Sequence, residues 1–135
     1  MGGFRRAWGI LPLTGAGSPL PQLEQHLRSG GFVCLLADRD LSRSAVDVVL
    51  CGRPARMPVG PALLARATGA ALLPTTCAYA GTDLEITLHE EIEVGPGEVG
   101  VRRATQQVAD AFSVAIRAHP EDWHMLQRVF GEDTR

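Results

Sequence analysis

The sequence has 135 residues, the size of one ordinary domain, and its content of 45% apolar and 21% charged residues excludes a disordered tail, a collagen-like fibre and a coiled coil. Its 13 basic and 15 acidic residues leave a formal net charge of −2, so it carries no strong positive field for nucleic acid. No window reaches the ~18 apolar residues of a membrane span, so membrane contact is expected from one side only. Cys34, Cys51 and Cys77 are widely spaced within or beside apolar runs, which favours three buried, reduced thiols in a cytosolic protein.

The first half of the chain alternates short apolar runs with turns. Residues 9–14 predict a strand, and residues 19–28 predict a helix that ends before two glycines. Residues 32–37 (FVCLLA) are apolar without interruption, which is typical of a strand covered on both faces of a mostly parallel sheet. A polar loop over 38–44 follows, and residues 46–51 predict another strand.

The second half continues this alternation. Residues 60–67 predict a helix and residues 70–78 a buried strand, whereas residues 82–89 alternate apolar and polar positions, so one face of that strand should be solvated. Residues 98–119 have the clearest helical periodicity, and a short helix is expected to restart at residues 119–122. Strands alternating with helices indicate an α/β fold with a mixed, mostly parallel sheet, in which 32–37 is central and 70–78 lies near it.

A glycine motif and two groups of metal-binding residue types have structural explanations. Residues 95–100 match GxGxxG, but an acidic segment precedes them where the dinucleotide motif needs a buried strand, so a turn into the long helix is predicted. Asp38 and Asp40 have no third ligand nearby, and a ligand-facing or solvated loop is favoured there. Near the C-terminus, four residues of metal-binding type lie close together in the sequence, and the start of a helix explains their pattern. These residues are His119, Glu121, Asp122 and His124. No metal site is therefore expected.

An arginine cluster is the more informative feature. Four arginines fall within 18 positions and are opposed by three aspartates; the arginines are Arg39, Arg43, Arg53 and Arg56. Two interpretations remain open, a pair of solvated loops and a site for a phosphate-bearing ligand, since guanidinium groups match phosphate geometry.

Three segments carry a resemblance to a known family. These are VCLLADRDLSRS at 33–44, GRPARMPVGPALLA at 52–65 and HPEDWHMLQ at 119–127. The first two resemble the late (lauroyl/myristoyl-type) lipid A acyltransferases, and the third resembles their actinobacterial branch, the phosphatidylinositol mannoside acyltransferases. The resemblance spans about residues 11–130.

The resemblance implies an α/β three-layer sandwich, with a mostly parallel sheet between helices. It implies transfer of a fatty acyl group from acyl-CoA, as a substrate and with no cofactor, to a sugar hydroxyl of a membrane glycolipid. The expected location is the cytoplasmic face of the plasma membrane, as a peripheral protein with no nucleic-acid partner.

The family's general base lies in a His-x4-Asp/Glu motif, and no histidine of this sequence has Asp or Glu five positions later. The chain therefore resembles the C-terminal portion of one acyltransferase domain over residues 1–135, incomplete as a fold and inactive alone. Asp47 matches the position of a family Glu and is the candidate for orienting the catalytic His. Arg53 and Arg56 are expected near the phosphates of acyl-CoA, as are Arg39 and Arg43.

Two alternatives to an acyltransferase fragment remain. One is a non-catalytic module that binds acyl-CoA or anionic lipid, and the other is an unrelated small α/β domain. An acyl-CoA titration separates these two.

Overall fold

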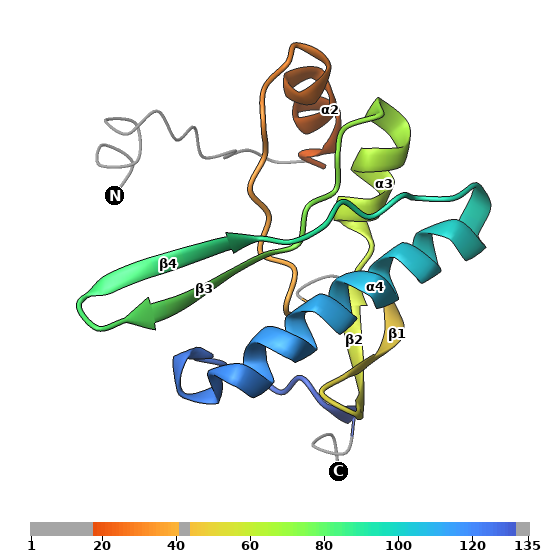
Figure 1. The fold of residues 1–135 in the computed structure, drawn as a ribbon. Helices are drawn as coiled ribbons and strands as arrows, with labels where there is room; N and C mark the ends of the chain where they lie inside the picture. Colours follow the sequence, from red (N-terminus) through yellow and green to blue (C-terminus); the bar gives the residue numbers. More distant parts are fainter. Residues whose placement is uncertain (1–17, 41–43, 132–135) are drawn as a thin grey trace. The chain divides into compact units, whose positions relative to one another are not determined.

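The computed structural model describes residues 18–40 and 44–131, and the chain divides into two compact units, residues 1–33 and 34–135 (Figure 1). In the first unit the described element is α2, Leu20–Arg28, which confirms the predicted helix. The helix ends at Arg28 and is capped by Ser29; Gly30 follows with a φ of 86°, which favours glycine, and the N–H of Gly31 donates to the carbonyl of His26. The strand predicted at 9–14 lies outside the described residues.

The second unit contains two hairpins and two α-helices. The order is β1 (Ala45–Leu50), β2 (Arg53–Pro58), α3 (Gly60–Thr68), β3 (Thr75–Ala80), β4 (Asp83–Leu88), α4 (Gly97–Ala118) and the 3-10 turn η1 (Pro120–Asp122). β1 pairs with β2 and β3 with β4, both antiparallel, as two separate sheets. The predicted mixture of helices and strands is confirmed.

The β1–β2 hairpin is closed by a two-residue turn. Cys51 and Gly52 have φ values of 53° and 80°, the pair of positive angles that a type I′ turn requires. No strand is predicted between residues 51 and 60, but Arg53–Pro58 (RPARMP) is a strand. Two of its inward positions, Ala55 and Met57, carry a small and a long apolar side chain, and both are buried.

The core of the unit lies between this hairpin and α4. The hairpin contributes one apolar face and the helix one apolar stripe, as the 3.6-residue period of 98–119 predicted. Leu50 and Met57 are fully buried. The buried cluster consists of Val48, Leu50, Ala55, Met57, Ala62, Ile92, Val101, Ala104, Val108 and Ala109.

Polar side chains of α4 cover the outer edge of β1. Gln106 accepts from the N–H of Val49 through Oε1 (2.9 Å) and donates to the carbonyl of Val49 through Nε2 (3.0 Å). Ser113 Oγ accepts from the N–H of Cys51 at 2.8 Å. The side chains thus pair the backbone groups that a further strand would otherwise pair.

The parallel, three-layer sheet is not present among residues 18–40 and 44–131. Residues 32–37 form no strand, and Phe32 and Leu36 are exposed. Within 70–78 the strand begins only at Thr75, and it pairs antiparallel with β4. An uninterrupted apolar run indicates that a segment is suited to burial. It becomes a strand only when neighbouring strands pair with it, and the described residues provide none beside residues 32–37.

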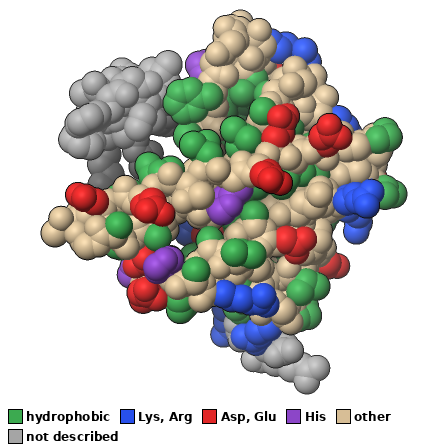
Figure 2. Space-filling view, viewed as in Figure 1, with side chains coloured by type: hydrophobic (Ala, Val, Ile, Leu, Met, Phe, Trp, Pro, Cys, Tyr) green, Lys and Arg blue, Asp and Glu red, His purple; other side chains and the backbone are tan. Residues whose placement is uncertain are grey.

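The β3–β4 hairpin has an apolar face that nothing in the second unit's described part covers. Tyr79, Leu84, Ile86 and Leu88 lie on the same face by register and are all exposed. The alternation predicted for 82–89 is present, but both faces of β4 are exposed. Figure 2 shows hydrophobic and acidic side chains together at the surface over this hairpin.

Residues 95–100 form the turn into α4, as predicted. Gly97 has a φ of 69° at the first position of the helix. A Cβ on Gly100 would overlap the carbonyl of Gly95, so the glycines permit a close backbone approach.

The cysteine prediction is wrong in one respect. All three thiols are free, but Cys34 and Cys77 are exposed and Cys51 is half-buried.

Among the described helices, none combines the length and apolar character that crossing a membrane requires.

Candidate functional site

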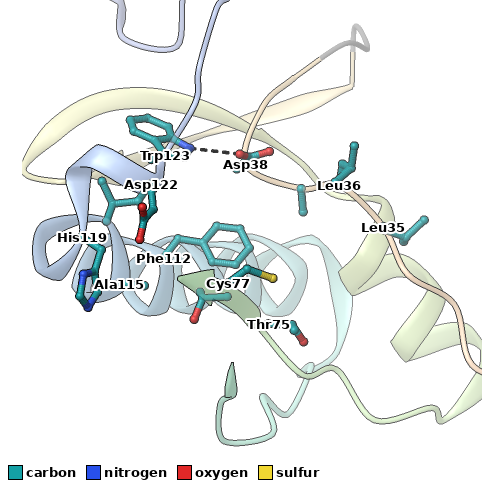
Figure 3. Close-up of a pocket in the computed structure, with 13 residues that line it drawn as sticks. Leu35, Leu36, Asp38, Thr75, Cys77, Phe112, Ala115, His119, Asp122 and Trp123 are labelled. Carbon is teal, nitrogen blue, oxygen red and sulfur yellow. Dashed lines mark hydrogen bonds between the residues drawn. The ribbon is translucent and has the colours of Figure 1, made fainter. Parts of the chain in front are cut away.

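A pocket of about 190 Å³ lies in the second unit, between an extended segment, β3 and the C-terminal half of α4 (Figure 3). The extended segment contributes residues 35–38 and the first half of β3 contributes residues 75–77. The floor is apolar and comes from α4. The remaining lining residues are Phe112, Ala115, Ile116, His119, Asp122 and Trp123.

One hydrogen bond joins two distant segments at the rim. The indole Nε1–H of Trp123 donates to Oδ2 of Asp38 at 3.1 Å, across 85 positions of sequence (Figure 3). The Trp123 ring also packs edge-on against Phe130, with centroids 6.4 Å apart. Asp38 therefore holds the end of the apolar segment against the segment that follows α4.

The turn after α4 forms the polar end of the pocket. Asp122 Oδ2 accepts from the backbone N–H of Tyr79 at 3.0 Å, which attaches β3 to η1. His119 Nδ1 lies 3.4 Å from Oε1 of Glu121. The ligand atoms of these three side chains lie within 4.8 Å of one another, but the Asp122 carboxylate already binds the backbone and His119 and Glu121 are exposed. η1 confirms the helical restart predicted at 119–122.

The chemistry of this lining differs from that of the predicted phosphate site. Among the described residues the lining includes no arginine, and its acidic side chains are Asp38 and Asp122. Thr75 and Thr76 add hydroxyls, and Thr76 Oγ1 already bonds Nε2 of His89 at 2.8 Å. The lining therefore combines an apolar floor with hydroxyl and carboxylate groups.

Asp47, the predicted orienting carboxylate, lies outside this pocket. It is on the outward face of β1, with its side chain 90% exposed, and Arg56 is directly opposite on β2. Arg56 Nε lies 3.6 Å from Asp47 Oδ1, and Nη2 donates to the carbonyl of Ala45 at 2.8 Å. This exposed pair leaves the carboxylate accessible to a partner residue.

The predicted arginines do not form one cluster. Arg53 is on the inward face of β2, with its guanidinium carbon 4.5 Å from the centre of the Phe130 ring, whereas Arg56 is on the outward face. Arg39 is partly exposed in the loop after the apolar segment, and Arg43 lies outside the described residues. The roles assigned to these four arginines and to Asp47 remain predictions.

The pairing of Trp123 with Asp38 is not predicted by the sequence, which indicates only a polar loop at Asp38. The only local signal was an aspartate directly after an apolar run, where ligands and rim contacts gather in sheet proteins. The indole partner could not be found from the sequence because it is 85 positions away.

Comparison with known proteins assigns the chain to a family. A family model described as bacterial lipid A biosynthesis acyltransferase matches residues 5–132. The phosphatidylinositol mannoside acyltransferase of Mycobacterium tuberculosis (strain H37Rv) is 47% identical over 127 residues, and that of Mycolicibacterium smegmatis is 43% identical over 127 residues. Each match covers 92% of this chain. The chain belongs to the lipid A biosynthesis acyltransferase family, which confirms the resemblance.

The chain spans about 40% of the length of these curated relatives. The elements described above, including the two small antiparallel sheets, therefore correspond to less than half of the length of a relative.

Proposed function

We propose that this chain provides the C-terminal portion of an acyltransferase that moves a fatty acyl group from acyl-CoA to a sugar hydroxyl of a phosphatidylinositol mannoside. The observation that carries the proposal is the 47% identity over 92% of the chain to an enzyme named for that acceptor. The product would be an ester, with the hydroxyl oxygen attacking the thioester carbonyl and the CoA thiol leaving.

The general base in this proposal comes from the rest of the acyltransferase, since no His-x4-Asp/Glu motif occurs in the 135 residues. Asp47 orients that base. Its place on an exposed strand face supports this role, because the opposite face of the hairpin is packed against α4 and Arg56 is the ion-pair partner of the carboxylate within the described residues.

Arg53 is the better supported of the predicted phosphate ligands. Its guanidinium is held over Phe130, which reduces the entropy lost when it binds an anion. The acyl donor would then approach the β2 side of the unit.

We also propose a peripheral location at the cytoplasmic face of the plasma membrane, where the acceptor lipid would be available.

A chimera tests the proposed function. The matched segment of the M. tuberculosis relative is replaced by this chain, and palmitoyl transfer from palmitoyl-CoA to a mannosylated phosphatidylinositol is measured. We expect the chimera to transfer and the 135-residue chain alone to be inactive, because a positioned base contributes about 100- to 10,000-fold. Turnover by the chain alone would refute the external base.

Two variants of the chimera test the role of Asp47. Asp47→Asn should lower kcat, whereas Asp83→Asn, an exposed carboxylate at the start of β4, should leave it unchanged. If Asp47→Asn leaves kcat unchanged, the orienting role is wrong and the family assignment still holds. An inactive chimera whose 135-residue parent binds palmitoyl-CoA in a titration would favour the non-catalytic binding module.

A further inference from the structure

We infer that the pocket between residues 35–38 and β3 is a slot for one β-strand, supplied by the part of the acyltransferase outside this chain. The inference rests on the proposed function in one respect, the origin of that strand.

The outer edge of β3 is open along the pocket. Ala80 and Asp83 flank the two-residue turn, so residues 76, 78 and 80 bond to β4 and residues 75, 77 and 79 point their N–H and C=O away from it. The structure supports this register independently, because the N–H of Tyr79 donates outward to Asp122. The outward backbone groups of Thr75 and Cys77 have no hydrogen-bond partner among the described residues, and both residues line the pocket.

The opposite side of the slot is also unpaired. The backbone groups of Leu35, Leu36 and Ala37 make no hydrogen bond within residues 18–40 and 44–131; Ala37 is 9% exposed, whereas Leu35 and Leu36 present apolar side chains that are 41% and 81% exposed. Buried backbone groups are almost always paired in folded proteins. Within the part of the chain that the structure describes, the backbone of this extended segment and the outer edge of β3 across the pocket both lack a pairing partner.

A polypeptide strand satisfies both edges, and an acyl chain satisfies neither. A strand offers N–H and C=O groups on both sides, whereas a hydrocarbon would leave the backbone groups of Cys77 and Leu36 unpaired at a cost. The α4 floor of Phe112, Ala115 and Ile116 would receive one face of the strand. The facing stretches of three to four residues correspond to roughly 10–13 Å of strand, which four or five residues fill.

The rest of the acyltransferase is the occupant that the observations favour. The curated relatives are about two and a half times the length of the matched segment, so most of their chain is available to supply a strand. A second copy of this chain is a poorer source, because each of its four described strands already uses one edge within a hairpin, whereas the slot needs a strand with both edges free.

Hydrogen exchange in the chimera tests the slot. Amides of residues 34–38 and of Cys77 should exchange at least about 10-fold more slowly in the chimera than in the 135-residue chain, while the amides in the buried part of α4 serve as the folding control. Equal exchange in both proteins would overturn the inference. Protection in the isolated chain that rises with its concentration would do so too, because the occupant would then be a second copy.

Two proline variants of the chimera, matched by register, locate the strand. Cys77→Pro removes an outward N–H at the slot, and Ile86→Pro removes the outward N–H directly opposite, on the far edge of β4. We expect Cys77→Pro to speed exchange at residues 34–38 about 10-fold and Ile86→Pro to change it less than about 2-fold. Equal effects would overturn the assignment to this edge.

The exchange readout separates this inference from the proposed function. Protection at the slot without acyl transfer would support the inference and refute the proposed function. Acyl transfer without protection would refute the inference and leave the proposed function in place. In the isolated chain, protection on adding palmitoyl-CoA would show that the pocket holds an acyl chain, which also overturns the inference.

Discussion

The two hairpins of the second unit are built alike and differ in their surroundings. Each has two six-residue antiparallel strands and a two-residue turn with a glycine at positive φ. Leu50 and Met57 of the first hairpin are fully buried, whereas every residue of β4 in the second is exposed. The comparison shows that local pattern and turn chemistry are sufficient for a hairpin, while its burial depends on the element that packs against it.

The edges of the two hairpins differ in the same way. The outer edge of β1 is paired by Gln106 and Ser113, and Ala55 of β2 forms an isolated bridge with Phe130. Within the described residues, the outer edge of β3 has one hydrogen-bond partner, the Asp122 carboxylate at the N–H of Tyr79. α4 thus completes one hairpin, and the other retains an edge that can accept a strand.

The largest expected effect comes from truncating the covered hairpin. Met57→Ala should lower the free energy of unfolding by about 2–5 kcal/mol, since it opens a cavity in the core. The matched change Ile86→Ala, on a side chain 59% exposed, should cost less than about 1 kcal/mol. Denaturant titrations of both variants measure the difference, and equal losses would mean that the second hairpin is covered in solution.

The next effect concerns the covered edge. Gln106→Leu removes both contacts to the backbone of Val49 and should cost about 1–3 kcal/mol, because a donor and an acceptor lose their partners. Gln107→Leu, an exposed position on the same helix, serves as the control and should be close to neutral. Thermal unfolding of the two proteins provides the measurement, and a neutral Gln106→Leu would show that water pairs this edge equally well.

A smaller effect is expected at the two turns. Gly52→Ala places a side chain at a φ of 80° and should lower the global free energy of unfolding by about 1–2 kcal/mol. Gly81→Ala introduces similar strain at 66°, but in a hairpin with little buried surface. We therefore expect Gly81→Ala to speed amide exchange within β3–β4 while leaving the global transition nearly unchanged. A global loss at both positions would show that the hairpins unfold together.

The smallest effect is expected at Asp47. Its ion pair with Arg56 is exposed on both sides, so Asp47→Asn should change the free energy of unfolding by less than about 0.5 kcal/mol. Denaturant titration of the isolated variant checks this value. A larger loss would make Asp47 a structural residue and weaken the interpretation of any loss of kcat in the chimera.

The elements that the sequence predicted well are those whose signal is local. The predicted helix at 98–119 corresponds to Gly97–Ala118, and the predicted strand at 46–51 to Ala45–Leu50. β2 was missed because Arg53, Pro54, Arg56 and Pro58 mask the two apolar positions between them. Prolines are tolerated in this strand because their positions alternate with those that pair with β1, so the missing N–H groups belong to the other edge.

The candidate site was less predictable than the elements. Asp38 was recognised as a residue after an apolar run, but the partner that holds it, Trp123, lies on another element. Arg53 and Arg56 were treated as one cluster because they are three positions apart, and a strand places such residues on opposite faces. Whether the two arginines share a face depends on the secondary structure of residues 53–58, which the sequence did not predict.

The sequence by itself determined the family, through motifs and 43–47% identity, and the helices and turns, through periodicity and glycine placement. Only the tertiary structure decided which hairpin is buried, which edges are paired and where residues 32–37 lie. The physical reason is that propensity and turn geometry act within a few neighbouring residues, whereas burial and strand pairing depend on surfaces from distant segments. An apolar run such as 32–37 therefore indicates that the segment is suited to burial. The structure shows that its backbone has no pairing partner among the described residues of this chain.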